Sequence, residues 1–234
     1  MIPHKRKQIQ LSELLNYLAL TNTPDNKIPP LQELSNELNL SVASLREQLA
    51  VARAIGVIEA RPRTGLKKLP YSFAPAVRES ASYAISCKPS YFEMYADLRR
   101  HIEASYWLQA VRLLSPDDVA EMYQLVDQAF EKLHGKPVQI PHREHRKLHL
   151  LTFSHIKNEF VMGILETYWD LYEAVGLDRL TDYSYLEEVW HYHRSIVDSI
   201  QAGNFEDAYK AMSTHMELIG QRTKHPTESR QKFE

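Results

Sequence analysis

The order of sequence patterns in residues 9–69 constrains the fold more than any other feature of the chain. Apolar residues recur at helical spacing in three short segments, and two segments of alternating character follow them. The three predicted helices cover residues 9–20, 31–38 and 42–55. A tight turn at residues 39–41 separates the second helix from the third, and Ser41 is a suitable N-cap for the third.

Residues 57–69 predict a two-stranded hairpin directly after these helices. Gly56 is typical of a helix C-terminus, residues 57–61 alternate as a strand does, and residues 62–65 form a turn before a returning strand at 66–69. Three helices followed by a hairpin is the order of a winged helix-turn-helix, in which the third helix enters the major groove of DNA. We therefore predict a DNA-binding domain over residues 1–70.

From Ser90 onward the chain is predicted to be helical throughout. The start of one helix is marked by Ser115 followed by Pro116. The expected helices are 90–114, 116–133, 142–155, 159–175, 185–201 and 205–221. The fold class is therefore mainly α, with an N-terminal winged helix-turn-helix and a C-terminal all-α helical bundle. The remaining predicted boundaries are a linker at 71–80, an effector domain at 81–222 and a tail at 223–234.

Charge is distributed unevenly along the chain. Residues 1–75 carry 10 Lys and Arg against 6 Asp and Glu, a balance of +4, and the remainder carries 18 against 24, a balance of −6. This asymmetry indicates that only the N-terminal part meets a polyanion such as double-stranded DNA.

The expected location is cytoplasmic, with no membrane partner. The sequence has no run of about 18 apolar residues, and its N-terminus lacks the apolar core of a signal peptide. A single cysteine, Cys87, excludes an intramolecular disulfide framework and a cysteine-rich zinc site.

Candidate DNA contacts lie on the third predicted helix and on the hairpin. The first turns of a recognition helix reach bases and phosphates, and a wing reaches phosphate or the minor groove. The candidates are Ser41, Ser44 and Arg46 on the helix and Arg61, Arg63, Thr64 and Lys67 on the hairpin.

This region resembles the GntR family of transcription regulators. The matching residues are Glu33, Leu34, Ser41, Arg46, Glu47, Leu49 and Gly56, followed by a wing that carries Gly65. The sequence departs from the family at Gln32 and Val42, where arginines are usual. The resemblance adds Gln32, at a family position that commonly contacts DNA, and Gly65 of the glycine-bearing wing to the candidate contacts.

Four histidines fall on the apolar faces of three predicted helices. His145 and His149 are four residues apart on one helix, and His193 and His215 lie on two later ones. An inward imidazole costs free energy unless something satisfies its nitrogens. A zinc, nickel or similar ion would satisfy several at once, and the alternative is that these histidines are satisfied core residues.

Residues 80–221 resemble the FCD effector domain of the FadR branch of the GntR family. Such domains commonly hold a metal through Asp-x-x-x-His, a histidine on a later helix and another about 22 residues beyond. The resemblance implies a divalent metal at His149, His193 and His215, the last two of which are 215 − 193 = 22 residues apart. His145 occupies the position of the family's aspartate. It is either a fourth, neutral ligand that favours softer ions, or a bystander beside a three-histidine site with open positions.

Arg99 shares a predicted helix face with four apolar or aromatic residues and is expected to point inward. A buried guanidinium needs an anionic partner. The FCD resemblance implies that Arg99 binds the carboxylate of an effector. The alternative is a structural ion pair with Glu103 or Asp97.

The predicted function is therefore a non-enzymatic, DNA-binding transcription regulator that acts as a homodimer and responds to a small organic acid bound near a metal. Dimerisation is expected because each of the two half-sites of an operator needs its own DNA-binding domain. Two alternatives stay open at this point. One is a metal-dependent hydrolase, which lacks an evident general base such as that of His-Glu-x-x-His. The other is a regulator whose C-terminal domain is structural and free of metal.

Overall fold

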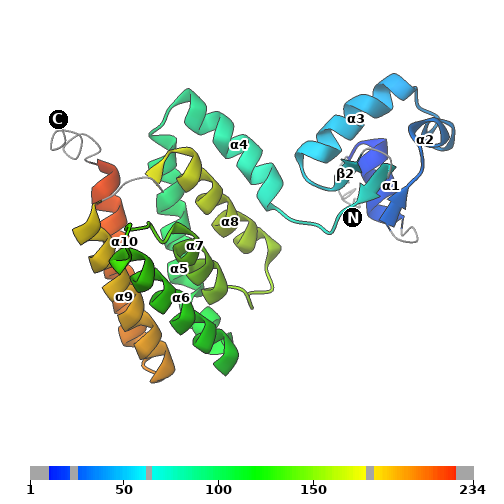
Figure 1. Cartoon of the computed structure of the whole chain (residues 1–234). Coiled ribbons are helices and arrows are strands. Elements are labelled where there is room, and N and C mark those ends of the chain that lie inside the picture. The colour runs from blue at the N-terminus through cyan, green and yellow to red at the C-terminus, as the bar shows by residue number, and fades with distance from the viewer. Residues whose placement is uncertain (1–10, 22–25, 62–64, 178–181, 225–234) are drawn as a thin grey trace, which may run out of the picture. The chain divides into compact units, whose positions relative to one another are not determined.

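The computed structural model describes residues 11–21, 26–61, 65–177 and 182–224, the last six by their backbone alone. The chain folds into two compact units, Met1–Glu79 and Ser80–Glu234 (Figure 1). None of the helices in the described ranges is long and apolar enough to cross a membrane.

The first unit contains three helices and a small sheet. Its elements are α1 (Glu13–Leu20), β1 (Lys27–Ile28), α2 (Leu31–Leu38), α3 (Val42–Ala54), β2 (Ile58–Arg61) and β3 (Gly65–Lys68). The sheet is antiparallel with the order β1-β3-β2, and Glu59 is paired with Lys67 in the hairpin. The helices and the hairpin confirm the predicted winged-helix order. The sheet has one strand that the sequence did not predict, β1. A strand of two residues is too short to show an alternating pattern.

Buried leucines fix α3 in this unit. Leu14, Leu34 and Leu45, from α1, α2 and α3, are fully buried in one apolar cluster. At the turn before α3, Asn39 adopts a left-handed conformation with φ 50°. The Oγ of Ser41 then accepts a hydrogen bond from the backbone N–H of Ser44 at 3.1 Å, as an N-cap does. The opposite face of α3 is consequently left exposed.

Helix α4 (Ala74–Cys87) lies where the sequence predicted a linker at 71–80 and no helix before Ser90. The misleading signal was Pro75, which is compatible with a helix here because it lies in the first turn, where its missing N–H costs nothing. Gly56, with φ +76°, lies directly against it: a Cβ added to Gly56 would be 2.4 Å from Cγ of Pro75. The predicted domain boundaries themselves remain predictions.

The second unit is a helical bundle, as predicted. Besides the later part of α4 it contains α5 (Tyr91–Leu113), α6 (Pro116–His134), α7 (His142–Thr152), α8 (Glu159–Ala174), α9 (Tyr183–Gln201) and α10 (Phe205–Lys224). Helix α9 packs against α6 and α10, and α5 packs against α8 and α10 (Figure 1). Most of the predicted tail, residues 225–234, lies outside the described residues.

A reciprocal cap begins α6. Oδ2 of Asp118 accepts hydrogen bonds from the backbone N–H and the hydroxyl of Ser115, and Nε2 of His155 lies 2.8 Å from the same oxygen. The hydrogen bonds from Ser115, followed by that from His155, lower the pKa of Asp118 from 3.8 to about 2. The stability that depends on the charged form is therefore present above pH 3.8 and is lost as the pH falls through about 2.

We expect Asp118→Ala to lower the free energy of unfolding at pH 7 by about 1 kcal/mol, since it removes the carboxylate half of the cap while the backbone N–H of residue 118 can still donate to Ser115. Urea unfolding at a series of pH values measures this effect, and the difference from wild type should shrink below pH 3.8. The control is Asp117→Ala, which removes an exposed acid from the same helical turn. Equal losses in the two variants would show that the cap contributes nothing specific.

Candidate functional site

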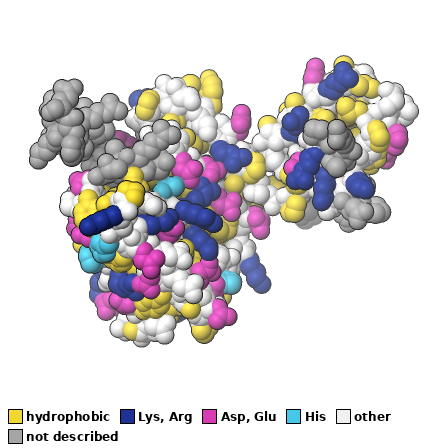
Figure 2. All heavy atoms as spheres, in the orientation of Figure 1, with side chains coloured by type: hydrophobic (Ala, Val, Ile, Leu, Met, Phe, Trp, Pro, Cys, Tyr) yellow, Lys and Arg dark blue, Asp and Glu magenta, His cyan; other side chains and the backbone are white. Residues whose placement is uncertain are grey.

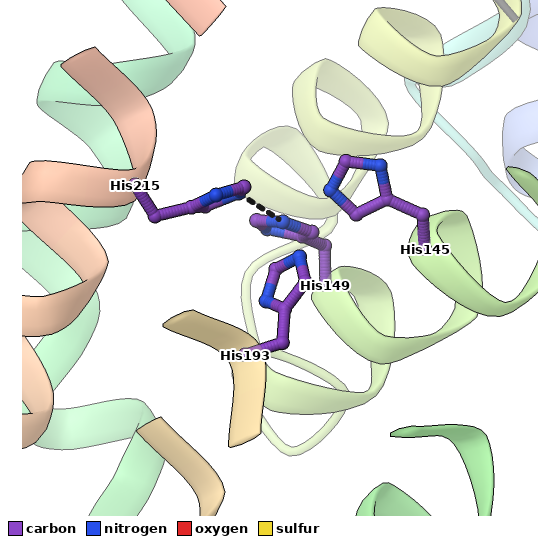
Figure 3. Close-up of side chains that lie close together, drawn as sticks. All are labelled: His145, His149, His193 and His215. Carbon is purple, nitrogen blue, oxygen red and sulfur yellow. Dashed lines mark hydrogen bonds between the residues drawn. The ribbon is translucent and has the colours of Figure 1, made fainter. Parts of the chain in front are cut away.

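The four predicted histidines lie together in the core of the second unit (Figure 3). His145 and His149 extend from α7, His193 from α9 and His215 from α10. One ring nitrogen from each lies within 4.8 Å of those of the other three. All four side chains are buried, His215 completely. The structure therefore brings together residues separated by as many as 70 positions in the sequence.

Helix geometry and aromatic packing place these rings. Residues four apart on α7 share one helix face, so both of its histidines point toward His193 of α9 and His215 of α10. Trp169 packs against His145 with ring centroids 4.8 Å apart, and Trp190 packs against His193 at 4.9 Å. The indole rings thus pack directly against the cluster.

Several nitrogens of the cluster have no hydrogen-bond partner although they are buried. These are Nε2 of His145, Nε2 of His193 and Nδ1 of His215. Each buried nitrogen left without a partner costs about 1–3 kcal/mol. The remaining contact joins Nε2 of His149 to Nε2 of His215 at 3.3 Å, drawn dashed in Figure 3. A divalent ion that accepted lone pairs from these rings would remove this cost, so the residues present fit a metal.

The protonation state of the cluster also suits a metal. Burial, followed by repulsion from neighbouring cationic groups, lowers the pKa of His145, His193 and His215 well below the ordinary 6.5. The rings are therefore neutral at pH 7, which is the form that ligates metals.

A buried ion pair lies directly behind His149. Nε of Arg99 donates to Oε1 of Glu103 at 2.9 Å, and both side chains are at most 2% exposed. The guanidinium also lies 4.2 Å from the ring centroid of Tyr168. Burial alone would raise the pKa of Glu103, but Arg99 and His149 hold it below its ordinary value, so the carboxylate stays charged. Of the two predicted ion-pair partners, Asp97 is exposed and pairs with Arg100 instead.

Arg99 and Glu103 compete for the same nitrogen of His149. Nη2 of Arg99 lies 2.8 Å from Nδ1 of His149, and Oε1 of Glu103 lies 3.6 Å from it. Arginine only donates, so in this arrangement Nδ1 accepts and the ring proton is on Nε2. For Nε2 to bind a metal, the proton must be on Nδ1, where Glu103 is the acceptor at hand. The sequence suggested the pair itself, but nothing in it indicated this contact with His149.

A small cavity adjoins the cluster and was not anticipated from the sequence. His149, His193 and Thr152 are among the residues that line it. The rest of its wall is apolar and consists of Trp107, Met122, Leu148, Ile196, Val197 and Met212.

Most of the predicted DNA-contacting residues are on the surface of the first unit, and Lys and Arg side chains are visible at several places on its face in Figure 2. Gln32, Ser41, Arg46, Arg61, Gly65 and Lys67 are exposed, whereas Ser44 is half-buried. Arg61 also forms an ion pair with Glu59. Gly65 has φ +81°, a conformation that favours glycine at the start of β3. Arg63 and Thr64 lie outside the described residues, and DNA contact by this set stays a prediction.

Comparison with known proteins agrees with this architecture. Residues 94–218, more than half of the chain, match the FCD domain family. The structure of Streptococcus agalactiae GntR is similar with a TM-score of 0.60 and 16% identity, over 89% of this chain and 95% of that one. E. coli McbR/YncC is similar with a TM-score of 0.45 and 16% identity, over 92% of this chain and 100% of that one. No curated protein matches the sequence. The chain therefore belongs to the FCD domain family, and it has the fold of a GntR regulator, as the sequence motifs predicted.

Proposed function

We propose that this protein is a DNA-binding transcription regulator whose helical unit binds a small organic acid at a divalent metal. The observation that carries the proposal is the cluster of four buried histidines with unpartnered nitrogens, in an FCD domain that follows a winged helix. In this proposal the metal supplies a positively charged position to which a carboxylate oxygen binds, and the protein supplies a dry and shaped surrounding.

The donor set favours zinc or nickel. Four neutral imidazole nitrogens suit these borderline ions, whereas magnesium and calcium prefer oxygen ligands. We propose His149, His193 and His215 as ligands. The unpartnered Nε2 of His145 supports it as the fourth. His145 stands where the family has an aspartate, so the proposed site has no negatively charged ligand.

Arg99 remains a proposed effector-binding residue, in a more restricted form. Its guanidinium is already bonded to Glu103 and is not on the wall of the cavity. An effector carboxylate would therefore have to share Arg99 with Glu103 or replace it. Otherwise Arg99 acts on the site through its contact with His149.

The two alternatives from the sequence receive less support. In a metal-dependent hydrolase a carboxylate near the metal would serve as general base, but Glu103, the carboxylate beside His149, is held by Arg99. The FCD and GntR assignment also indicates a regulator and not an enzyme. A purely structural helical unit without metal would leave the buried histidine nitrogens unsatisfied.

Binding of DNA through α3 and the hairpin, by a homodimer that spans two half-sites, is the second half of the proposal. A duplex selected from a random library by the full-length protein provides the operator for the test. Mobility shift of that duplex is then measured with metal-free protein, with zinc-loaded protein, and with zinc-loaded protein plus acetate. We expect a metal- or acetate-dependent change in affinity. Affinity that is identical in all three states would contradict the proposed regulation.

A pair of arginine variants tests the proposed orientation of α3 on DNA. Arg46 and Arg53 are both exposed, Arg46 in the N-terminal half of α3 and Arg53 in its last turn. We expect Arg46→Ala to weaken binding about 10-fold or more, because it removes a contact to base or phosphate. The slope of log K against log salt should fall by about 1 if that contact is to phosphate. Arg53→Ala, with the same charge change, should bind as wild type does. Equal losses would mean that α3 contributes only net charge.

A further inference from the structure

The cavity beside His149 and His193 has an almost entirely apolar wall. Its six apolar residues come from α5, α6, α7, α9 and α10, so every long helix around the site except α8 contributes to it. A molecule bound to an ion at the histidines would reach this wall first, because two of the histidines belong to the cavity itself.

The polar groups on the wall are already used within the protein. Nε1 of Trp107 donates to the backbone carbonyl of Phe205 at 3.3 Å. The hydroxyl of Thr152 donates to the carbonyl of Leu148 at 2.9 Å. Besides the histidines, no other polar side chain is among the described residues of the wall. A ligand hydroxyl placed here would therefore lose its hydrogen bonds to water and find no free donor among the described side chains of the wall. Besides the histidines, the one side-chain acceptor in this described set is the oxygen of Thr152.

We propose that the effector is a short monocarboxylic acid with an apolar tail, bound with its carboxylate at the histidine cluster and its tail in this cavity. The inference rests on the proposed function and adds the chemical class of the acid. It disfavours sugar acids and other acids whose hydroxyls lie away from Thr152, because each buried hydroxyl without a partner weakens binding by about 10-fold or more.

The tail must be short because the free space is about that of a single water molecule. Entry of even a few carbons requires side chains to move. Met122 and Met212, on α6 and α10, are the wall residues suited to this, since an unbranched thioether changes rotamer readily. Movement of these two methionine side chains would enlarge the cavity and leave its wall apolar.

The test compares two acids of equal chain length, butanoate and 4-hydroxybutanoate, with acetate as the reference for the metal alone. Isothermal titration calorimetry is carried out on full-length, zinc-loaded protein. We expect butanoate to bind at least about 10-fold more tightly than 4-hydroxybutanoate, for the reason given above.

A matched pair of variants locates the effect. Val197 and Val126 are both fully buried in the same apolar core, but only Val197 is on the cavity wall. Val197→Thr adds a hydroxyl to the wall at nearly constant volume, and its oxygen can accept a hydrogen bond from 4-hydroxybutanoate. The ratio of the affinities for butanoate and 4-hydroxybutanoate should therefore fall several-fold. Val126→Thr carries the same chemical change and should leave the preference unaltered.

The outcomes separate this inference from the proposed function. If acetate binds but 4-hydroxybutanoate binds as well as butanoate, or butanoate does not bind, the apolar tail site is wrong and the metal-bound acid stands. If none of the three acids binds zinc-loaded protein, both are wrong. An equal fall of this affinity ratio in the two threonine variants would also overturn the assignment of the tail to this cavity.

Discussion

Binding of one zinc or nickel ion per chain is expected to raise the midpoint of thermal unfolding of the helical unit by about 8–16 °C. A ligand that binds only the folded state at a free concentration 1,000 times its Kd adds about 4 kcal/mol to the free energy of unfolding. For a unit of this size, 1 kcal/mol corresponds to about 2–4 °C. Circular dichroism at 222 nm measures the midpoint before and after loading of chelator-treated protein, and mass spectrometry counts the ions.

Two histidines on α9 provide the matched variants for this prediction. His193 is buried in the cluster, and His191 is exposed two residues away. His193→Gln should abolish most of the metal-dependent increase, whereas His191→Gln should retain it. An increase that survives in His193→Gln, or that disappears in His191→Gln, would place the ion elsewhere.

The second large effect is expected at the buried ion pair of Arg99 and Glu103. Glu103→Ala leaves a buried guanidinium without its carboxylate, so the free energy of unfolding should fall by about 3–5 kcal/mol. The double variant Arg99→Met/Glu103→Leu removes both charges and should recover most of this loss. Asp97→Ala, which breaks an exposed ion pair on the same helix, should cost about 1 kcal/mol or less. Chemical denaturation of metal-free protein measures all three.

A charge-only variant separates the structural role of Glu103 from its proposed role behind a metal ligand. Glu103→Gln keeps the shape of the side chain but removes the negative charge that would accept the Nδ1 proton of His149 once Nε2 binds a metal. Loss of such a carboxylate behind a ligating histidine typically weakens metal binding about 10–100-fold. Zinc affinity from competition with a chromophoric chelator should show this decrease, and unchanged affinity would confine Glu103 to a structural role.

The sequence predicted those parts of the fold that depend on periodicity and on local signals. Six long helices of the second unit show apolar residues on one face, and Ser115–Pro116 marks a start that the structure confirms with a reciprocal cap. Signals that admit two meanings were less reliable. Pro75 lies within the predicted linker, yet the structure places it in the first turn of α4, and Ser90, predicted as a cap, makes no capping hydrogen bond before α5.

The histidine cluster was predictable because each member lies on an apolar helix face, where a polar ring is out of place. Its neighbours were not predictable in the same way. Contact between Glu103 and His149 depends on how α5 and α7 pack, and the apolar cavity depends on side chains from five helices. Periodicity shows which face of a helix points inward, but it does not show which inward residues meet.

Every tryptophan of the chain is packed around the histidine cluster or its cavity: Trp169 and Trp190 touch histidine rings, and Trp107 lines the cavity. Intrinsic fluorescence excited at the red edge of the absorption band therefore reports on the helical unit and is silent on the winged helix, which contains tyrosine but no tryptophan. The proposed binding of metal and acid can thus be tested in the presence of DNA, without a label, from one optical signal that originates only in the helical unit.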